Sequence, residues 1–214
     1  MEEALSSKMD IKAFIFDMDG LLFDSERIVQ RSWEMAGDEL GIPHMGDVIY
    51  HTLGMNRTGR NEYFRKYIRE DFPFEEFGKL TRDNFWKIVD KEGLPLKKGV
   101  KELLAYGKEQ GYKMAVATSS SREYAMGNLI RAGIDPYFDS VICGDMVKKA
   151  KPDPEIYQKA CESLGIQPEY CMAFEDAPGG ILSAHQAGMQ VIMVPDLVQP
   201  TQEIRELTYR VCDS

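Results

Sequence analysis

Short apolar runs alternate with longer amphipathic stretches along most of this sequence, and that alternation constrains the fold more than any other feature. The apolar runs are Ile11–Phe16, Lys113–Thr118, Ser140–Cys143, Cys171–Phe174 and Gln190–Val194. The stretches with helical spacing that lie between them are Gly99–Gln110, Arg122–Ala132, Pro154–Leu164 and Gly179–Ala187. Strands that alternate with helices in this way predict βαβ units around a parallel sheet.

Glycines mark the ends of these helical stretches. Those that stand just before the next strand or its connection are Gly111, Gly133, Gly165 and Gly188. Glycine adopts the left-handed conformation that commonly ends a helix, so we expect helix C-caps at these positions. Gly179 and Gly180 instead open a helical stretch, and we expect them to let that helix approach the sheet closely.

The interval from Ser25 to Gly93 breaks the alternation, because it contains no convincing strand. Its helical stretches are Glu26–Leu40, Asp47–Leu53, Arg57–Arg69 and Phe74–Lys91. Gly41-Ile-Pro43 and Asp71-Phe-Pro73 separate some of them. We therefore expect an α/β core formed by residues 1–22 and 94–214, with an all-helical domain, residues 23–93, inserted after the first strand.

Composition excludes several classes of protein. The chain has 26 Lys and Arg against 35 Asp and Glu, a formal net charge of −9, which argues against broad nucleic-acid binding. The first ten residues lack the basic and apolar regions of a signal peptide, and no apolar stretch is long enough to span a membrane. The 4 cysteines lack zinc-site spacing and predict reduced thiols that are buried or partly buried. We expect a cytoplasmic protein without a membrane, nucleic-acid or obligate protein partner.

Polar side chains gather where the predicted strands end. They are Asp17, Asp19, Thr118, Ser119, Lys151, Glu175 and Asp176. The carboxyl ends of parallel strands form the ligand-binding edge of an open sheet. Clustered carboxylates repel one another, and a hard cation with oxygen ligands such as Mg²⁺ resolves that repulsion. A lysine and a hydroxyl beside them suit a phosphate dianion, so the pattern indicates phosphoryl chemistry.

These segments resemble the four motifs of the haloacid dehalogenase superfamily. They are Asp17-Met-Asp-Gly-Leu-Leu-Phe-Asp24, Val116-Ala-Thr-Ser-Ser, Lys151-Pro-Asp-Pro-Glu-Ile-Tyr157 and Phe174-Glu-Asp-Ala-Pro-Gly-Gly180. They occur in the family's order, and the resemblance covers nearly the whole chain from Ile11. The helical insert is similar to the α-helical cap of the β-phosphoglucomutase-like branch. The resemblance implies a Rossmann-like core.

The resemblance also implies a role for each motif residue. Asp17 would be the nucleophile and Asp19 the general acid and base. Thr118, Ser119 and Lys151 would bind the phosphoryl group. Asp17, the Asp19 carbonyl and Asp176 would bind Mg²⁺, with Glu175 also in the metal's shell. In the cap, Arg57, Ser25 and Glu26 are candidates for substrate contact.

Departures from the family pattern narrow the expected activity. Asp19 is present, whereas the dehalogenases lack this second carboxylate, so phosphoryl chemistry is favoured. The mutases carry a histidine where this chain has Val29, and a lysine where it has Ser121. We therefore expect a Mg²⁺-dependent phosphomonoesterase that hydrolyses a small phosphorylated metabolite, a sugar phosphate or a nucleotide-like compound, through an aspartyl-phosphate. The alternatives are a β-phosphoglucomutase-like isomerase and an inactive protein that binds a phosphorylated ligand.

Overall fold

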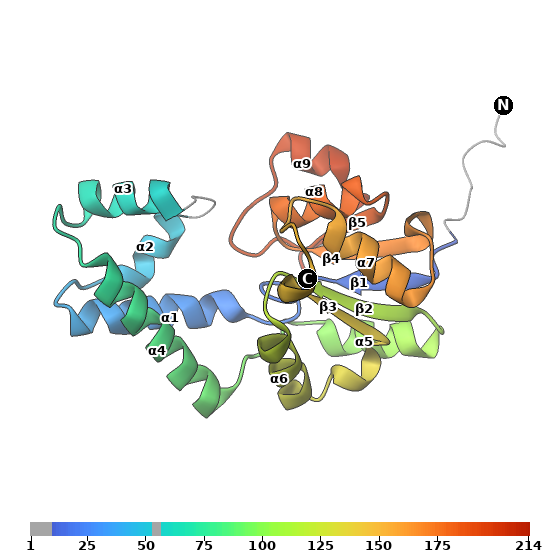
Figure 1. The fold of residues 1–214 in the computed structure, drawn as a ribbon, viewed down its shortest axis with the longest axis horizontal. Helices are drawn as coiled ribbons and strands as arrows, with labels where there is room; N and C mark the ends of the chain where they lie inside the picture. The colour runs from blue at the N-terminus through green and yellow to red at the C-terminus, as the bar shows by residue number, and fades with distance from the viewer. Residues whose placement is uncertain (1–9, 53–56) are drawn as a thin grey trace. The chain divides into compact units, whose positions relative to one another are not determined.

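The structure, a computed structural model, describes residues 10–52 and 57–214, the second range with side chains from residue 59 onward. It divides into two compact units. The first unit runs to Phe23 and resumes at Leu96, and the second comprises Asp24–Pro95. Figure 1 shows the elements of both units, which we describe separately.

The first unit is built on a six-stranded sheet whose strand order is β3-β2-β1-β4-β5-β6, with every pair parallel. The strands are β1 (Ala13–Phe16), β2 (Lys113–Thr118), β3 (Ser140–Cys143), β4 (Cys171–Glu175), β5 (Gln190–Met193) and β6 (Arg210–Val211). All four residues of β1 are buried, because this strand pairs on both sides, with β2 and β4. Strand order reverses there, so the carboxyl ends of β1 and β4 form the switch point at which such sheets bind ligands.

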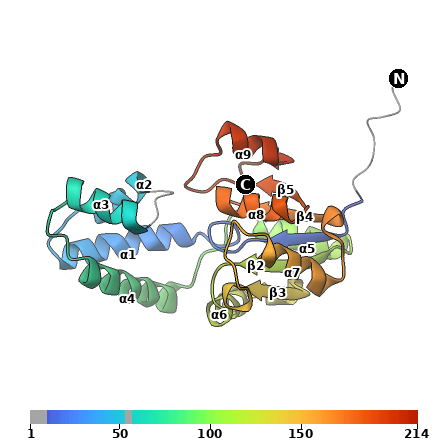
Figure 2. The ribbon, with the colours of Figure 1, turned by 45° about the horizontal axis from the view of Figure 1, so that its top comes forward.

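Helices cover both faces of this sheet (Figures 1 and 2). They are α5 (Val100–Glu109), α6 (Arg122–Ala132), α7 (Glu155–Leu164), α8 (Pro178–Gln186) and α9 (Gln202–Leu207), with 3-10 turns at Asp135–Tyr137, Gly144–Met146 and Pro168–Tyr170. On one face, Ile15 packs in a buried cluster with Ile156 and Tyr157 of α7 and Ile181 of α8. Successive side chains of a strand point to opposite faces, so Phe14 and Phe16 belong to the other face.

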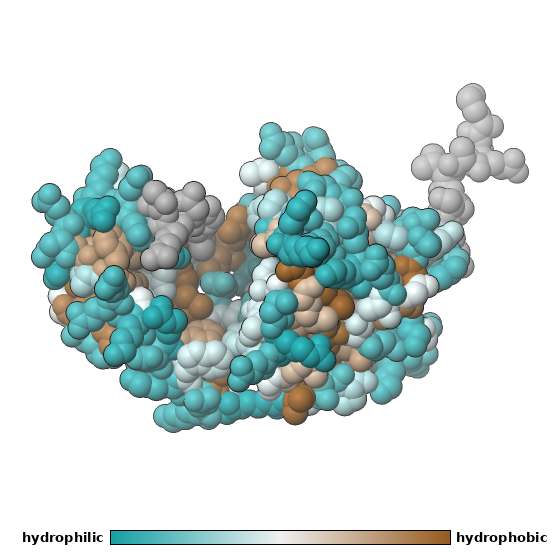
Figure 3. Space-filling model, in the orientation of Figure 1, coloured by the Kyte–Doolittle hydropathy of each residue, from teal (hydrophilic) through white to brown (hydrophobic). Residues whose placement is uncertain are grey.

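The second unit contains only helices among its described residues. They are α1 (Ser25–Glu39), α2 (Met45–His51), α3 (Arg57–Tyr67) and α4 (Phe74–Glu92). Its core is aromatic: the Trp33 ring of α1 meets Phe64 and Phe77 edge-on, with centroids 5.7 and 5.6 Å apart. The face of this unit visible in Figure 3 is mainly hydrophilic. The insert expected after the first strand is therefore helical, and Trp33, Phe64 and Phe77 serve its own core, whereas Trp86 is exposed.

The chain enters and leaves the helical unit through two paired segments. Phe23 and Leu96 form an antiparallel bridge, and the Lys97 amide donates to the Leu22 carbonyl at 2.9 Å. One step further along, the Asp24 amide donates to the Pro95 carbonyl, also at 2.9 Å. The two connections thus form a short antiparallel ribbon.

Most of the predicted elements are confirmed, with differences of a few residues at their ends. The strand and helix patterns reappear as β1 to β5 and α1 to α8. Leu53, where the second predicted helix was expected to end, lies outside the described residues. The predicted C-cap glycines all have positive φ, for example 68° at both Gly133 and Gly165. The sequence analysis missed α9 and β6, because elements this short carry no readable periodicity.

Two further expectations concern cysteines and membranes. All four cysteines are free thiols: Cys143, Cys161 and Cys171 are buried and Cys212 is partly buried, as predicted. Within the described residues, no helix combines the length and apolar character that crossing a membrane requires.

Candidate active site

Three carboxylates meet at the ends of β1 and β4. Asp17 directly follows β1, and its amide donates to the Phe174 carbonyl at 3.0 Å, which continues the ladder between these strands. Glu175 ends β4 and Asp176 follows it. One oxygen from each of these three carboxylates lies within 4.8 Å of the others. The structure therefore brings together three of the carboxylates that the sequence analysis selected.

Lys151 joins this group from a segment far away in the sequence. Its ammonium donates to Asp17 Oδ1 at 2.5 Å, to Glu175 Oε1 at 2.7 Å and to the Ala117 carbonyl at 3.0 Å. Only 10% of its side chain is exposed. A buried ammonium needs such partners, because burying an unpaired charge is costly. Lys151 is therefore a fixed part of the acidic cluster, unlike the exposed Lys148 and Lys149 beside it.

Tyr157 is a member of the cluster that sequence reasoning missed. Its ring is fully buried in α7, and its hydroxyl donates to Glu175 Oε1 at 2.6 Å. The same Glu175 oxygen therefore accepts from both Lys151 and Tyr157. In the sequence, Tyr157 is indistinguishable from an aromatic residue on the apolar face of a helix, so no pattern indicated its polar role.

Burial and mutual repulsion govern the protonation of these groups. Burial raises the pKa of Asp17 to about 7; Glu175 adds to the rise and Lys151 opposes it. Burial, together with Asp17 and Glu175, raises the pKa of Asp176 to about 9. For Lys151, burial alone would lower the pKa, but Asp17 and Glu175 outweigh it and hold the pKa above its ordinary value. Without a further cation, the cluster is thus short of positive charge.

This donor set fits a divalent cation. Three ionised carboxylates and one ammonium leave two negative charges in excess, and all the candidate ligands are oxygens. Mg²⁺ prefers oxygen ligands and offsets that excess. The raised pKa values of Asp17 and Asp176 also indicate a cation site, because the positive charge of the protein itself does not offset the negative charge of these two carboxylates.

The carboxylate of Asp19 is not one of these three, although its charge also helps to raise the pKa of Asp17, and it has its own donors. The Ser120 hydroxyl donates to Asp19 Oδ2 at 2.7 Å, and the Tyr124 hydroxyl donates to Oδ1 at 3.1 Å. Ser120 follows β2, and Tyr124 lies in the first turn of α6. Sequence reasoning identified neither donor, because both look like ordinary residues around a helix N-terminus.

Thr118 and Ser119 lie where β2 ends, as predicted. Thr118 is buried, and its hydroxyl oxygen accepts the amide of Ser120 at 3.1 Å. Ser119 is exposed. The N-cap of α6 is Ser121, whose hydroxyl accepts the amide of Tyr124. Ser121, rather than Thr118 or Ser119, therefore caps α6. The sequence alone did not show which of these residues is the cap.

The three candidates in the helical unit belong to its first and third helices. Ser25, which is buried, begins α1, and Glu26 follows it. Arg57 begins α3, but its side chain lies outside the described residues.

Two glycines allow the backbone to approach the carboxylates closely. Gly20 has φ of 84°, and a side chain there would overlap the Asp176 carboxylate. A methyl group at Gly180, in the first turn of α8, would overlap the Glu175 carboxylate. At Gly179 a methyl group would meet open space within the described part of the chain. The expected close approach is therefore confirmed for Gly180 and wrong for Gly179.

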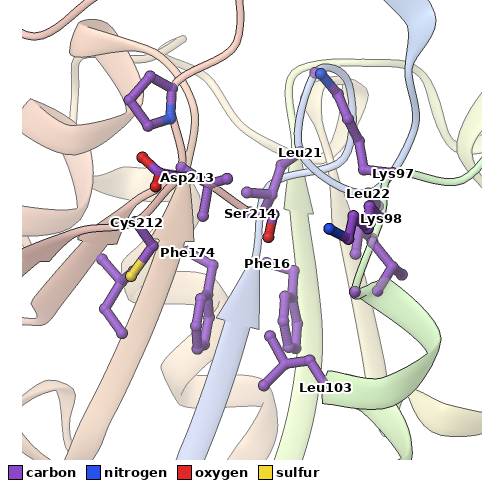
Figure 4. Close-up of a pocket in the computed structure, with 16 residues that line it drawn as sticks. Phe16, Leu21, Leu22, Lys97, Lys98, Leu103, Phe174, Cys212, Asp213 and Ser214 are labelled. Atoms are coloured by element: carbon purple, nitrogen blue, oxygen red, sulfur yellow. The ribbon is translucent and has the colours of Figure 1, made fainter.

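A separate cavity of about 570 Å³ opens on the other face of the sheet. Figure 4 shows the Phe16 and Phe174 rings side by side in it, with Lys97 and Lys98 on one rim and Asp213 on the opposite rim. These two rings stack with their centroids 4.8 Å apart. Phe16 and Phe174 precede Asp17 and Glu175 on their strands, so this apolar cavity is distinct from the acidic cluster.

Comparisons with known proteins agree with this arrangement. Residues 11–188 match the family of haloacid dehalogenase-like hydrolases. The chain is 33% identical to the phosphorylated carbohydrates phosphatase of Thermotoga maritima, over 85% of this chain and 84% of the relative. It is 31% identical to hexitol phosphatase A of Escherichia coli, over 87% of this chain and 84% of the relative.

Solved structures show the same fold. The structure of CbbY from Rhodobacter sphaeroides in complex with phosphate superimposes with a TM-score of 0.70 at 26% identity, covering 95% of this chain and 94% of that one. β-Phosphoglucomutase from Clostridium difficile shares the fold, with a TM-score of 0.67 at 24% identity, over 95% and 91% of the two chains. The chain therefore belongs to the haloacid dehalogenase-like hydrolase family, and within it is a phosphatase.

Proposed function

We infer that this phosphatase is a Mg²⁺-dependent phosphomonoesterase that acts on a small phosphorylated carbohydrate through an aspartyl-phosphate on Asp17. The observation that carries the proposal is the group of the buried Asp17 and Glu175 and the partly buried Asp176, with the Lys151 ammonium bonded to the first two. Such a group combines a nucleophile, a metal-binding set and a fixed positive charge, which phosphoryl transfer requires.

In the first step of this proposal, an oxygen of Asp17 forms a bond to phosphorus while the bond from phosphorus to the leaving oxygen breaks. Asp19 gives a proton to that leaving oxygen. In the second step, a water oxygen bonds to phosphorus, the bond to Asp17 breaks, and Asp19 accepts the water's proton. Lys151 holds Asp17 in place through a 2.5 Å hydrogen bond and offsets the phosphoryl charge.

The metal would be held by Asp17, Asp176 and the Asp19 carbonyl, with Glu175 also in its shell. When bound, Mg²⁺ would supply positive charge that offsets the charge of the phosphoryl group. Thr118 and Ser119 would bind phosphoryl oxygens where β2 ends.

The relatives support a carbohydrate as substrate. The Thermotoga maritima and Escherichia coli proteins are named as phosphatases of phosphorylated carbohydrates and of hexitols. In this proposal, the helical unit, residues 24–95, acts as the cap that selects the substrate, and Ser25, Glu26 and Arg57 are its candidate contacts.

The test is phosphate release with Mg²⁺ from a panel of sugar phosphates, polyol phosphates and nucleotides. We expect release from one or a few members, complete dependence on the metal, and no release by Asp17→Asn. Failure on the whole panel, or full activity of Asp17→Asn, would refute the proposal.

The panel also decides between hydrolysis and isomerisation. β-Glucose 1-phosphate is included, and glucose 6-phosphate is measured beside free phosphate. We expect free phosphate, because Val29 stands where the mutases carry a histidine. Glucose 6-phosphate without free phosphate would identify a mutase.

A further inference from the structure

Both carboxylate oxygens of Asp19 accept a hydrogen bond from a hydroxyl group. Oδ2 accepts from Ser120 at 2.7 Å and Oδ1 accepts from Tyr124 at 3.1 Å. The donors come from different places, the end of β2 and the first turn of α6. The Tyr124 backbone is itself anchored, because its amide donates to the N-cap hydroxyl of Ser121.

These two hydrogen bonds fix the orientation of the Asp19 carboxylate. One donor follows β2 and the other lies in α6, so two separate elements hold the carboxylate. A general base must lie within hydrogen-bond reach of the proton that it accepts, so a fixed carboxylate serves the removal of a proton from water.

We propose that Tyr124 is a positioning residue that holds Asp19 as the base for the second half of the reaction, the hydrolysis of the aspartyl-phosphate. In that step the water oxygen bonds to phosphorus, the bond between phosphorus and Asp17 breaks with its electron pair returning to Asp17, and the water proton passes to Asp19. The inference rests on the proposed function, and it assigns to Tyr124 a part that neither the motifs nor the relatives' names give it.

The two half-reactions can be separated with p-nitrophenyl phosphate. Its leaving group is acidic enough to depart without a proton, so the first step needs little from Asp19. The value of kcat/KM reports that step, whereas kcat also includes hydrolysis of the aspartyl-phosphate. A residue that serves only the second step therefore changes kcat and leaves kcat/KM nearly constant.

The experiment compares wild type, Tyr124→Phe and the control Tyr106→Phe, which removes a hydroxyl from a half-exposed tyrosine on α5. Losing one hydrogen bond to a charged group predicts a fall in kcat of about tenfold for Tyr124→Phe. We expect kcat/KM to stay within about twofold of wild type, KM to fall with kcat, and a burst of p-nitrophenol close to one equivalent per chain. Ser120→Ala should likewise lower kcat and leave kcat/KM nearly constant. The control Tyr106→Phe should match wild type in both values.

Three results would overturn the inference. One is a kcat for Tyr124→Phe within about twofold of wild type. Another is a parallel fall of kcat and kcat/KM without a burst, which would mean that the hydroxyl merely maintains the shape of the site. If wild type itself shows no Asp17-dependent release of p-nitrophenol, the proposed function fails and the inference fails with it, a result that is distinguishable from the other two.

Discussion

Gly179 and Gly180 are adjacent in the first turn of α8, yet the structure predicts opposite effects when each becomes alanine. Alanine is favoured over glycine in a helix by about 1 kcal/mol. At Gly179 the added methyl meets open space within the described residues, so Gly179→Ala should raise the free energy of unfolding by up to about 1 kcal/mol. This variant is a matched control for its neighbour.

At Gly180 the added methyl overlaps the Glu175 carboxylate. Glu175 cannot simply turn away, because its Oε1 is held by Lys151 at 2.7 Å and Tyr157 at 2.6 Å. Moving the Glu175 carboxylate breaks hydrogen bonds to a charged group, each of which contributes about 1.5–3 kcal/mol. After the helix-propensity gain, Gly180→Ala should lower the free energy of unfolding by about 2–4 kcal/mol and reduce turnover strongly.

The measurement is thermal and urea unfolding of both variants followed by far-UV circular dichroism. Tryptophan fluorescence is a poor probe here, since Trp33 and Trp86 both lie in the helical unit. A change of this size corresponds to a fall in Tm of roughly 5–15 °C for Gly180→Ala. Equal stability of the two variants would refute the reasoning, because it would mean that Glu175 is not tethered against α8.

Three more predictions concern the acidic cluster and the helical unit. In metal-free protein, the raised pKa values of Asp17 and Asp176 mean that the folded state binds protons that the unfolded chain releases, so stability falls as pH rises from about 4 towards 9. Mg²⁺ should therefore raise Tm more at pH 8.5 than at pH 6, and a pH-independent rise would contradict this. Tyr157→Phe should lower the free energy of unfolding by about 1.5–3 kcal/mol, since the Glu175 carboxylate loses a buried donor; urea titration checks this, and no change would count against the hydrogen bond. Asn84→Ala removes a fully buried amide that bonds to a carboxylate on α1 and should destabilise the helical unit by about 1–3 kcal/mol, detectable by tryptophan fluorescence as a lower unfolding midpoint; an unchanged midpoint would refute it.

The sheet and its functional edge could be predicted from the sequence because both depend on short-range patterns. Buried strands appear as apolar runs, and the residues that follow them must lie at the carboxyl edge of a parallel sheet. Asp17 and Glu175 could be placed in this way. Lys151 was harder: its place after the third strand put it near this edge, but Lys148 and Lys149 share that place, and only the family motif distinguished it from them.

The donors around these carboxylates could not be predicted, because a hydrogen-bond partner depends on tertiary structure rather than on spacing. Tyr157 has the position of a core aromatic, and Tyr124 that of an ordinary residue in a first helical turn. Gly179 and Gly180 illustrate the same point. Only the tertiary structure shows that an added methyl group would overlap Glu175 at Gly180 and meet open space at Gly179, within the described residues.

The antiparallel ribbon that joins the two units has a consequence for how such a protein can change over evolution. Phe23 and Leu96 are already partners, so the chain leaves the sheet unit and returns to it at neighbouring points. Closing a loop between neighbouring points costs little more entropy when the loop is long, because the cost grows only logarithmically with its length. The helical segment can therefore lengthen, shorten or be exchanged while Asp17, Lys151 and Glu175 keep their places on the sheet. If the helical unit selects the substrate, as proposed, substrate preference can diverge in this way without disturbing the chemistry.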